Sequence, residues 1–157
     1  MLGKGLRLYK SEKLCSTRAI DRLFACRPGM SADNHTDAWG EVRVALCYPL
    51  RMIYGTNYGR KGAPIQFLIS VPKKRLRKAV DRVTMRRRIR ECYRLVRGPV
   101  EKIQYDDTLP RLDVVFIYVG SKKEDSARVR KAMSRLLGML MTQKDSSENG
   151  ISETGAD

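Results

Sequence analysis

Residues 73–97 carry the densest group of side chains able to do chemistry. The segment holds twelve cations and only two acids, Asp81 and Glu91. The cations are Lys73, Lys74, Arg75, Arg77, Lys78, Arg82, Arg86, Arg87, Arg88, Arg90, Arg94 and Arg97. Most are arginines, whose planar guanidinium forms paired hydrogen bonds to phosphate oxygens and stacks on bases. An excess of this kind predicts a polyanionic partner.

The cationic segment is expected to be helical, because no Pro or Gly occurs between residue 79 and Gly98. Winding it at about 100° per residue gathers the apolar side chains into one narrow stripe beside a face of arginines. The stripe consists of Met85, Ile89, Cys92 and Val96, and the arginines on the neighbouring face are Arg82, Arg86, Arg90, Arg94 and Arg97. Like charges four residues apart destabilise a helix by a few tenths of a kcal/mol per pair. A bound polyanion would remove that repulsion.

Two other interpretations of the segment carry less weight. Solvated charged faces usually mix signs so that neighbouring turns pair, whereas only Asp81 and Glu91 could pair here. A basic helix lying on an anionic membrane usually has Trp or Phe on its apolar side, and this stripe has neither. Nucleic-acid contact is therefore the favoured interpretation.

The sequence offers little for catalysis by the protein itself. His35 is the only histidine and lies among turn-forming residues, without acid or thiol neighbours. The four cysteines have no Cys-x-x-Cys spacing, and the glycine-rich residues 55–62 are not followed by a Gly-Lys-Ser/Thr helix start. We therefore expect no catalytic side chain, no protein-bound metal and no small-molecule cofactor.

Composition indicates one folded domain with an anionic partner. The chain has 157 residues, 42% of them hydrophobic, a net charge of +15 and a pI near 10.1. Its longest apolar run, residues 114–119, is too short to cross a bilayer, and the N-terminus lacks the hydrophobic core of a signal peptide. A cytoplasmic protein is expected, with no membrane contact and no evident protein partner.

Periodicity predicts helices interleaved with strands. Helices are expected from residue 16 or 17 to about 26, from 79 to 97 and over 126–141. Strands are expected over 41–54 with a break at Pro49, over 64–71 and over 112–119. Residues 55–62 are expected to form a hairpin loop. Residues 1–10 are predicted to be a basic mobile arm, 11–141 a single RNA-binding domain and 142–157 a disordered polar tail. The order α-β-β-β-α-β-α predicts an α+β two-layer sandwich with about four strands and the helices packed on the sheet.

Three segments together give a specific resemblance. They are residues 10–14 with Ile20-Asp21-Arg22-Leu23-Phe24, the strand exit Ser70-Val71-Pro72-Lys73-Lys74, and residues 78–94 with their run of arginines. In this combination and order, over about residues 6–140, the chain resembles the protein subunit of bacterial ribonuclease P. The resemblance implies a left-handed βαβ crossover, an exception to the usual right-handed rule.

The resemblance also implies a function. Ribonuclease P is a ribonucleoprotein endonuclease that removes the 5′ leader of precursor tRNA, and in this family the RNA subunit holds the catalytic Mg²⁺ ions. The implied partners are ribonuclease P RNA and precursor tRNA. The RNA subunit would contact Arg82, Arg86, Arg87, Arg90 and Arg94. The leader would stack on Phe24, Tyr48 and Phe67, with its phosphates near Lys73 and Lys74.

One departure from the family pattern lies in the central helix. Where the family has Arg-Asn-Arg, this chain has Arg82-Val83-Thr84, which keeps only the first arginine. The alternatives are a non-catalytic RNA chaperone or ribosome-associated protein with the same basic helix, and a DNA-binding protein. No helix-turn-helix spacing precedes the basic segment, which disfavours DNA.

Overall fold

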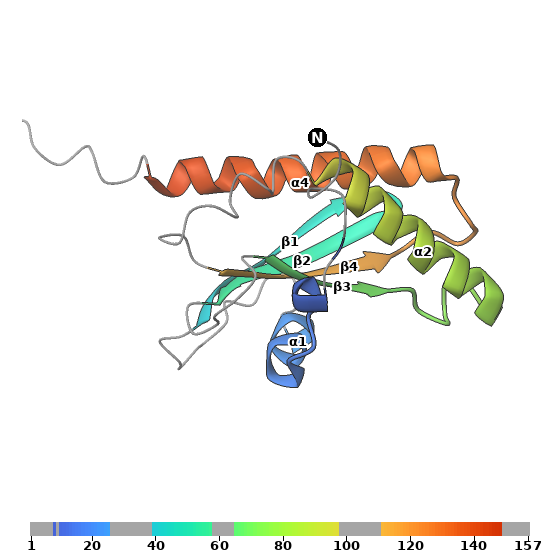
Figure 1. Ribbon diagram of the computed structural model, residues 1–157, viewed down its shortest axis with the longest axis horizontal. Coiled ribbons are helices and arrows are strands. Elements are labelled where there is room, and N and C mark those ends of the chain that lie inside the picture. Colours follow the sequence, from blue (N-terminus) through green and yellow to red (C-terminus); the bar gives the residue numbers. More distant parts are fainter. Residues whose placement is uncertain (1–7, 9, 26–38, 58–64, 98–110, 149–157) are drawn as a thin grey trace, which may run out of the picture.

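The computed structural model describes residues 8, 10–25, 39–57, 65–97 and 111–148. Its elements follow one another along the chain in the predicted order α-β-β-β-α-β-α, preceded by a short 3-10 turn (Figure 1). They are η1 (Lys10–Glu12), α1 (Thr17–Ala25), β1 (Trp39–Cys47), β2 (Leu50–Asn57), β3 (Ile65–Ser70), α2 (Ala79–Val96), β4 (Arg111–Tyr118) and α4 (Ser126–Glu148). The predicted α+β class is confirmed.

The four strands form one mixed sheet in the order β1-β2-β4-β3. β1 and β2 are antiparallel and meet in a tight turn at Tyr48 and Pro49, so the break predicted at Pro49 separates two strands. β4 pairs antiparallel with β2 and parallel with β3. The predicted hairpin after β2 was therefore wrong, because β4 lies between β2 and β3. Gly55, Thr56 and Asn57 belong to β2, and residues 58–64 lie outside the described part of the chain.

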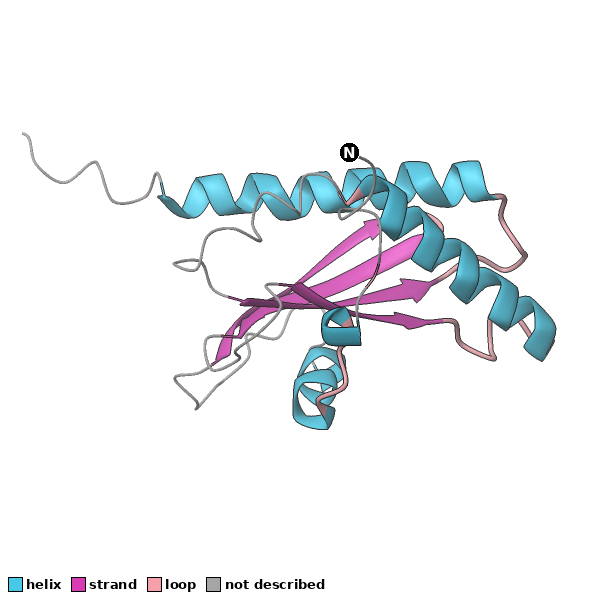
Figure 2. Cartoon of the chain, viewed as in Figure 1, coloured by secondary structure: helices cyan, strands magenta, loops and turns pink. Residues whose placement is uncertain are grey.

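Helices cover both faces of the sheet (Figure 2). The larger core lies between the sheet and the pair α2 and α4, where Met52, Phe116, Met85, Ile89 and Met133 are all fully buried. A smaller core lies on the opposite face, where α1 packs on the sheet; it contains Leu14, Ala19, Leu23, Val42, Ile53 and Val115. The predicted two layers correspond to the sheet with α2 and α4, and α1 adds a partial third layer.

The connection between the parallel strands β3 and β4 passes through α2. α2 buries Met85, Ile89 and Cys92, the core of the predicted apolar stripe, together with Tyr93. Val96 is half-buried against the same core. The left-handed sense of this crossover stays a prediction implied by the family resemblance.

The fold extends beyond the predicted domain boundaries at both ends. Lys13 forms a parallel bridge with Phe67 at the outer edge of β3, and Leu14 N–H donates to the Phe67 carbonyl at 3.0 Å, so this N-terminal stretch is part of the fold. Lys10, placed in the predicted arm, lies in η1; residues 1–7 and 9 of that arm lie outside the described residues. The tail prediction was wrong over residues 142–148, which continue α4 to Glu148, and residues 149–157 are not described.

Candidate nucleic-acid interface

The arginines of α2 fall into two groups according to what their guanidinium groups touch. Arg82 Nη1 donates to the carbonyls of Leu76 and Arg77, at 2.9 and 2.7 Å. Arg94 forms an ion pair with Glu91. The Arg94 guanidinium in turn holds the pKa of Glu91 below its usual value. These two predicted RNA contacts therefore already make bonds within the protein.

Arg97 does not lie with the other arginines that were predicted to share one side of α2. Its Nη1 lies 2.8 Å from Glu12 Oε1, and both side chains are buried. Burial raises the pKa of the neighbouring Tyr93, with Glu12 adding to the effect. The ion pair thus fastens the end of α2 to η1, and we assign it to stability.

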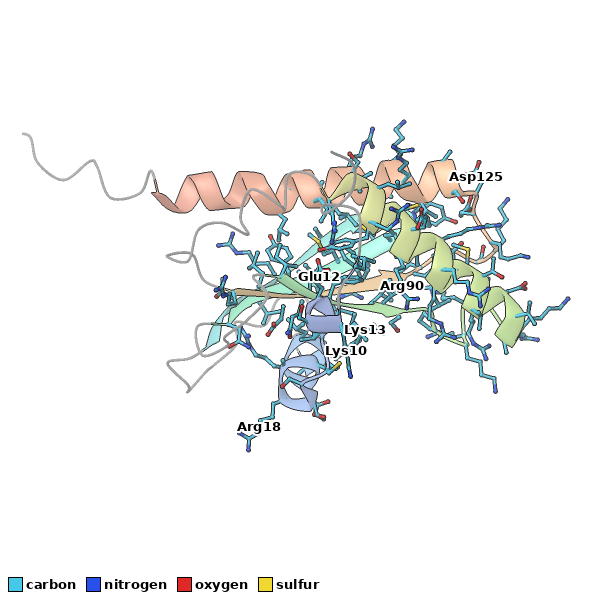
Figure 3. The ribbon with its side chains drawn as sticks, viewed as in Figure 1. Lys10, Glu12, Lys13, Arg18, Arg90 and Asp125 are labelled. Atoms are coloured by element: carbon cyan, nitrogen blue, oxygen red, sulfur yellow. The ribbon has the colours of Figure 1, made fainter. Side chains whose placement is uncertain are left out.

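Three of the predicted arginines remain open to a ligand. Arg87 and Arg90 are exposed and Arg86 is half-buried, and none of the three is hydrogen-bonded or ion-paired within the described residues. Arg90 projects from the side of α2 turned away from α4 (Figure 3). We call Arg86, Arg87 and Arg90 the arginine face. Guanidinium groups at this spacing can contact successive phosphates of a backbone.

A cationic turn adjoins α2 at its start. Lys73, Lys74 and Arg75 are exposed in the turn that leaves β3. The Arg75 and Leu76 N–H groups both donate to the Pro72 carbonyl, and Arg82 binds the two carbonyls that follow. Arg82 is therefore a positioning residue for the turn as well as a nearby charge. Lys73 and Lys74 stay predicted leader contacts.

On the opposite face of the sheet, α1 leaves one row of side chains uncovered. Register places Leu46, Arg51, Ile117 and Ser70 side by side across all four strands. Leu46 is 64% exposed and the other three are half-buried, whereas Ile53 and Val115 in the next row are buried under α1. We call these four residues the open row. It combines apolar surface with one guanidinium, as a single-stranded nucleic acid would need.

The three predicted stacking aromatics do not share one surface. Phe24 is 45% exposed on α1. Phe67 is 6% exposed in the larger core, with its ring centroid 4.2 Å from that of Tyr93 and 6.4 Å from that of Phe116. The prediction that Phe67 stacks on a base was wrong, because its side of β3 faces α2 and α4. Only Phe24 lies on the helix that borders the open row.

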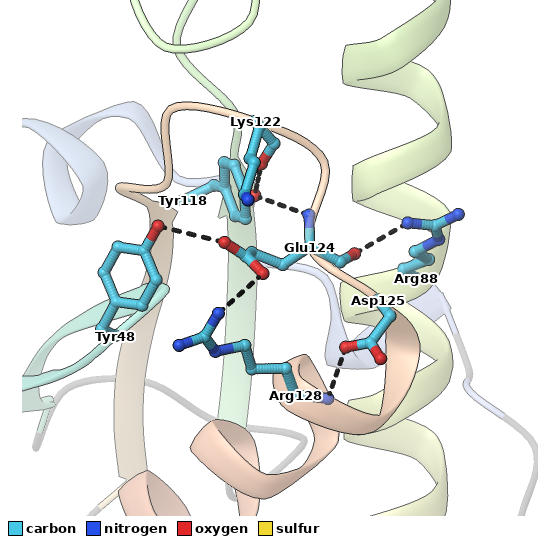
Figure 4. A network of polar contacts seen from close by, with 7 residues as sticks. All are labelled: Tyr48, Arg88, Tyr118, Lys122, Glu124, Asp125 and Arg128. Atoms are coloured by element: carbon cyan, nitrogen blue, oxygen red, sulfur yellow. Dashed lines mark hydrogen bonds and ion pairs between the residues drawn. The ribbon is translucent and has the colours of Figure 1, made fainter.

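Tyr48 belongs to a polar network at the start of α4 (Figure 4). Its hydroxyl donates to Glu124 Oε1 at 3.1 Å, and the Arg128 guanidinium lies 5.4 Å from its ring centre. Arg128 Nη1 also donates to Glu124 Oε2 at 3.1 Å, and Arg88 Nη1 donates to the Glu124 carbonyl at 2.7 Å. The residue is 48% exposed, so Tyr48 can still stack, at the end of the sheet and apart from Phe24.

Tyr118 completes this network from the end of β4. Its hydroxyl accepts from the Glu124 N–H at 3.1 Å and donates to the Lys122 carbonyl. Burial raises the pKa of Tyr118, so the hydroxyl stays protonated and able to donate. Glu124 is thus bonded at its buried carboxylate, which accepts from Tyr48 and Arg128, and at its N–H, which donates to Tyr118. The connection from β4 to α4 is therefore held in one conformation.

Two kinds of feature are absent from the described residues. No group of three or more His, Cys, Asp or Glu there could hold a metal ion. No helix among them is both long and apolar enough to span a membrane. The described residues therefore provide cations, hydrogen-bond donors and apolar surface to a ligand.

Comparison with known proteins gives the family. The model of the family described as Ribonuclease P matches residues 8–141. The chain belongs to this family. Ribonuclease P protein components from two strains of Porphyromonas gingivalis are each 30% identical over 130 residues, which is 83% of this chain and 83% of theirs. The ribonuclease P protein of Staphylococcus aureus has the same fold, with a TM-score of 0.56 at 16% identity, over 83% of this chain and 96% of that one.

Family membership gives the general function. The chain is a protein subunit of ribonuclease P, with RNA binding and a part in the 5′ processing of tRNA. Its partner is ribonuclease P RNA. The identification made from the basic helix and the two shorter segments is confirmed, and it takes precedence over the chaperone and DNA-binding alternatives.

Reasoning from the sequence missed one residue of the candidate interface in this ribonuclease P protein. Arg51 lies in the open row beside Ile117, although it appears in the chain as a lone cation inside a strand. Strand alternation could have placed it on the face opposite Leu50 and Met52. That alternation does not show which face of the sheet α1 covers.

Proposed function

We propose that the arginine face of α2 binds ribonuclease P RNA and that the open row, with Phe24, receives the 5′ leader of precursor tRNA. Hydrolysis is then carried out by the RNA subunit with its Mg²⁺ ions. The protein contributes no reacting group. Its tasks are to neutralise phosphates, hold the leader and work beside the RNA in the cytoplasm.

The observation that carries this proposal is the separation of two surfaces by the sheet. The arginine face belongs to α2 on one side, and the open row is on the side of α1. Ser70, at the end of the open row, is followed three residues later by the cationic turn. A leader crossing the open row toward Ser70 would meet Lys73 and Lys74, which then contact its phosphates.

The chemical character of the two surfaces supports the division of roles. Guanidinium groups suit the regular backbone of a folded RNA, since they contact phosphates without reading bases. A leader varies in sequence, and apolar or aromatic surface accepts any base because every base has a π face. The arginine face therefore suits the RNA subunit and the open row suits the leader.

The test is cleavage of precursor tRNA by the cognate RNA subunit at low Mg²⁺, with and without the protein. We expect the protein to stimulate cleavage, and to do so more strongly for a substrate with a leader of several nucleotides than for one with a single nucleotide. Neutralising phosphates lowers the Mg²⁺ that the RNA needs, so high Mg²⁺ should reduce the difference.

Variants assign the two surfaces. Arg86→Gln with Arg90→Gln should weaken binding of the RNA subunit and lower the slope of log K against log salt by about 1.5. Phe24→Ala should leave that binding unchanged and reduce the preference for the long leader. Arg18→Gln removes an exposed cation of α1 and serves as the matched control. Equal stimulation of both substrates would overturn the leader assignment, and equal binding of unrelated RNA would favour a general chaperone.

A further inference from the structure

A groove runs along the outer surface between α2 and α4. Its volume is about 630 Å³. Val96 lines it from α2, and α4 contributes Ala127, Arg130, Lys131, Ser134 and Arg135. Three of its six lining residues are thus cations, and no acid is among them.

The α4 residues of the groove form one stripe by helical geometry. Spacings of three and four residues join Ala127, Arg130 and Lys131 to Ser134 and Arg135. Gly138 continues the stripe, and a side chain built there would meet nothing within 4 Å. The small residues Ala127, Ser134 and Gly138 leave the helix surface open along the stripe, and the cations flank it. A bulky anionic backbone can therefore approach the helix closely.

The groove cations form no ion pair with a carboxylate of the described residues. Residues 126–140 contain four cations, Arg128 among them, and no acid. Arg128 is paired with Glu124, whereas Arg130, Lys131 and Arg135 form no ion pair within the described residues. Lys131 and Arg135 lie one turn apart and repel each other. An anionic ligand would relieve that repulsion.

This groove is distinct from the arginine face. Arg88 and Cys92 turn toward α4, since they donate to the carbonyls of Glu124 and Ser126. Arg86 and Arg90 each lie two residues earlier than one of these, about 200° away around the helix. The arginine face and the groove therefore occupy opposite flanks of α2.

We propose that the α2–α4 groove is a second binding site for the phosphodiester backbone of ribonuclease P RNA. This inference rests on the proposed function, since it takes the RNA subunit to lie along α2. The groove is on the α2 and α4 side of the sheet, away from the open row, so a leader on the α1 face would not reach it. With a site on either flank, the RNA subunit would hold α2 from both sides.

The decisive experiment uses the full chain and ribonuclease P RNA without precursor, titrated over a range of salt concentrations. The groove variant combines Arg130→Gln, Lys131→Gln and Arg135→Gln. Each lost phosphate contact lowers the salt slope by about 0.7 to 0.9, so we expect a fall of about 2 to 3. At physiological salt the affinity should drop on the order of 100-fold. Arg18 is an exposed cation of α1, on the other side of the sheet (Figure 3). Arg18→Gln should change neither the salt slope nor the affinity.

Footprinting separates the two sites. Protection of the RNA backbone from hydroxyl radicals should be lost at one set of nucleotides in the groove variant and at another in Arg86→Gln with Arg90→Gln. All three groove cations are exposed, so the variant should unfold at the same urea concentration as the natural chain. If it does not, Lys131→Gln alone should still lower the slope by about one unit.

Two results would overturn the inference and leave the proposed function standing. One is an unchanged salt slope in the groove variant while the arginine-face variant weakens binding. The other is a loss of affinity that appears only when precursor tRNA is added, which would assign the groove to the substrate. If neither variant affects the binding of ribonuclease P RNA, both the inference and the proposed function fail.

Discussion

Replacing Phe67 tests whether this aromatic belongs to the core. The structure buries its ring between Tyr93 and Phe116, with only 6% of the residue exposed. Removing a buried phenyl ring costs about 3–5 kcal/mol. With a urea m value of about 2 kcal/mol per M, Phe67→Ala should lower the unfolding midpoint by about 2 M. Phe67→Leu, which leaves a smaller cavity, should lower it less and stays measurable if the alanine variant does not fold.

Phe24→Ala is the matched comparison. Phe24 is 45% exposed, so the same truncation should cost no more than about 1 kcal/mol of stability. It should instead weaken binding of a leader, by about 5- to 150-fold if one base stacks on the ring at 1–3 kcal/mol. The measurements are urea unfolding followed by circular dichroism and titration with leader-bearing precursor in the presence of the RNA subunit. An unchanged midpoint in Phe67→Ala together with weaker leader binding would refute the assignment of Phe67 to the core.

Three further predictions concern other parts of the molecule. Gly120→Ala should destabilise the fold by about 1–3 kcal/mol in urea unfolding, because the added Cβ would lie 2.6 Å from the Tyr118 hydroxyl oxygen; an unchanged midpoint would show that Tyr118 can move freely. Cys92 should react with iodoacetamide at pH 8 more slowly than the exposed Cys15, since burial raises the pKa of the Cys92 thiol and leaves less thiolate; equal rates, read by mass spectrometry, would contradict its burial. Glu91→Gln should tighten RNA binding several-fold at low salt, because it removes a negative charge and the ion pair that engages Arg94; weaker binding in the same titration would mean that the pair orients Arg94 usefully.

The sequence predicted local structure well wherever neighbouring residues decide it. Met85, Ile89 and Cys92 lie on one stripe because a helix brings such spacings together, and all three are buried. The continuous apolar run of β4 is typical of a central strand, and β4 lies between β2 and β3. These features follow from periodicity alone.

Features that depend on distant contacts were not predictable in this way. Alternation put Ile65, Phe67 and Ile69 on one face of β3, but it could not say that this face meets α2 and α4. The expected hairpin after β2 failed because β4, more than fifty residues later, pairs with β2 instead. The local pattern is the same for either pairing.

In the candidate site, too, some features follow from residue spacing and others do not. A face of arginines follows from spacing, and two of its predicted members, Arg86 and Arg90, remain open to a ligand. The burial of Arg97 against Glu12 depends on a segment 85 residues earlier in the chain. Arg82 and Arg94 bond to residues no more than six positions away, and their side-chain conformations decide this, which spacing alone does not give. Charge counts therefore indicated the candidate interface, and side-chain geometry shows which of its charges are open to a ligand.

The insertion of β4 between β2 and β3 has a consequence for biosynthesis. While the nascent chain emerges from the ribosome, β3 and α2 are made before the strand that joins β3 to the rest of the sheet. The basic helix is thus synthesised before its docking surface is complete, because part of that surface comes from β4 and α4. A chain that stalls before β4 would expose the arginines on an unanchored segment. Specific assembly with RNA therefore has to await the last third of translation.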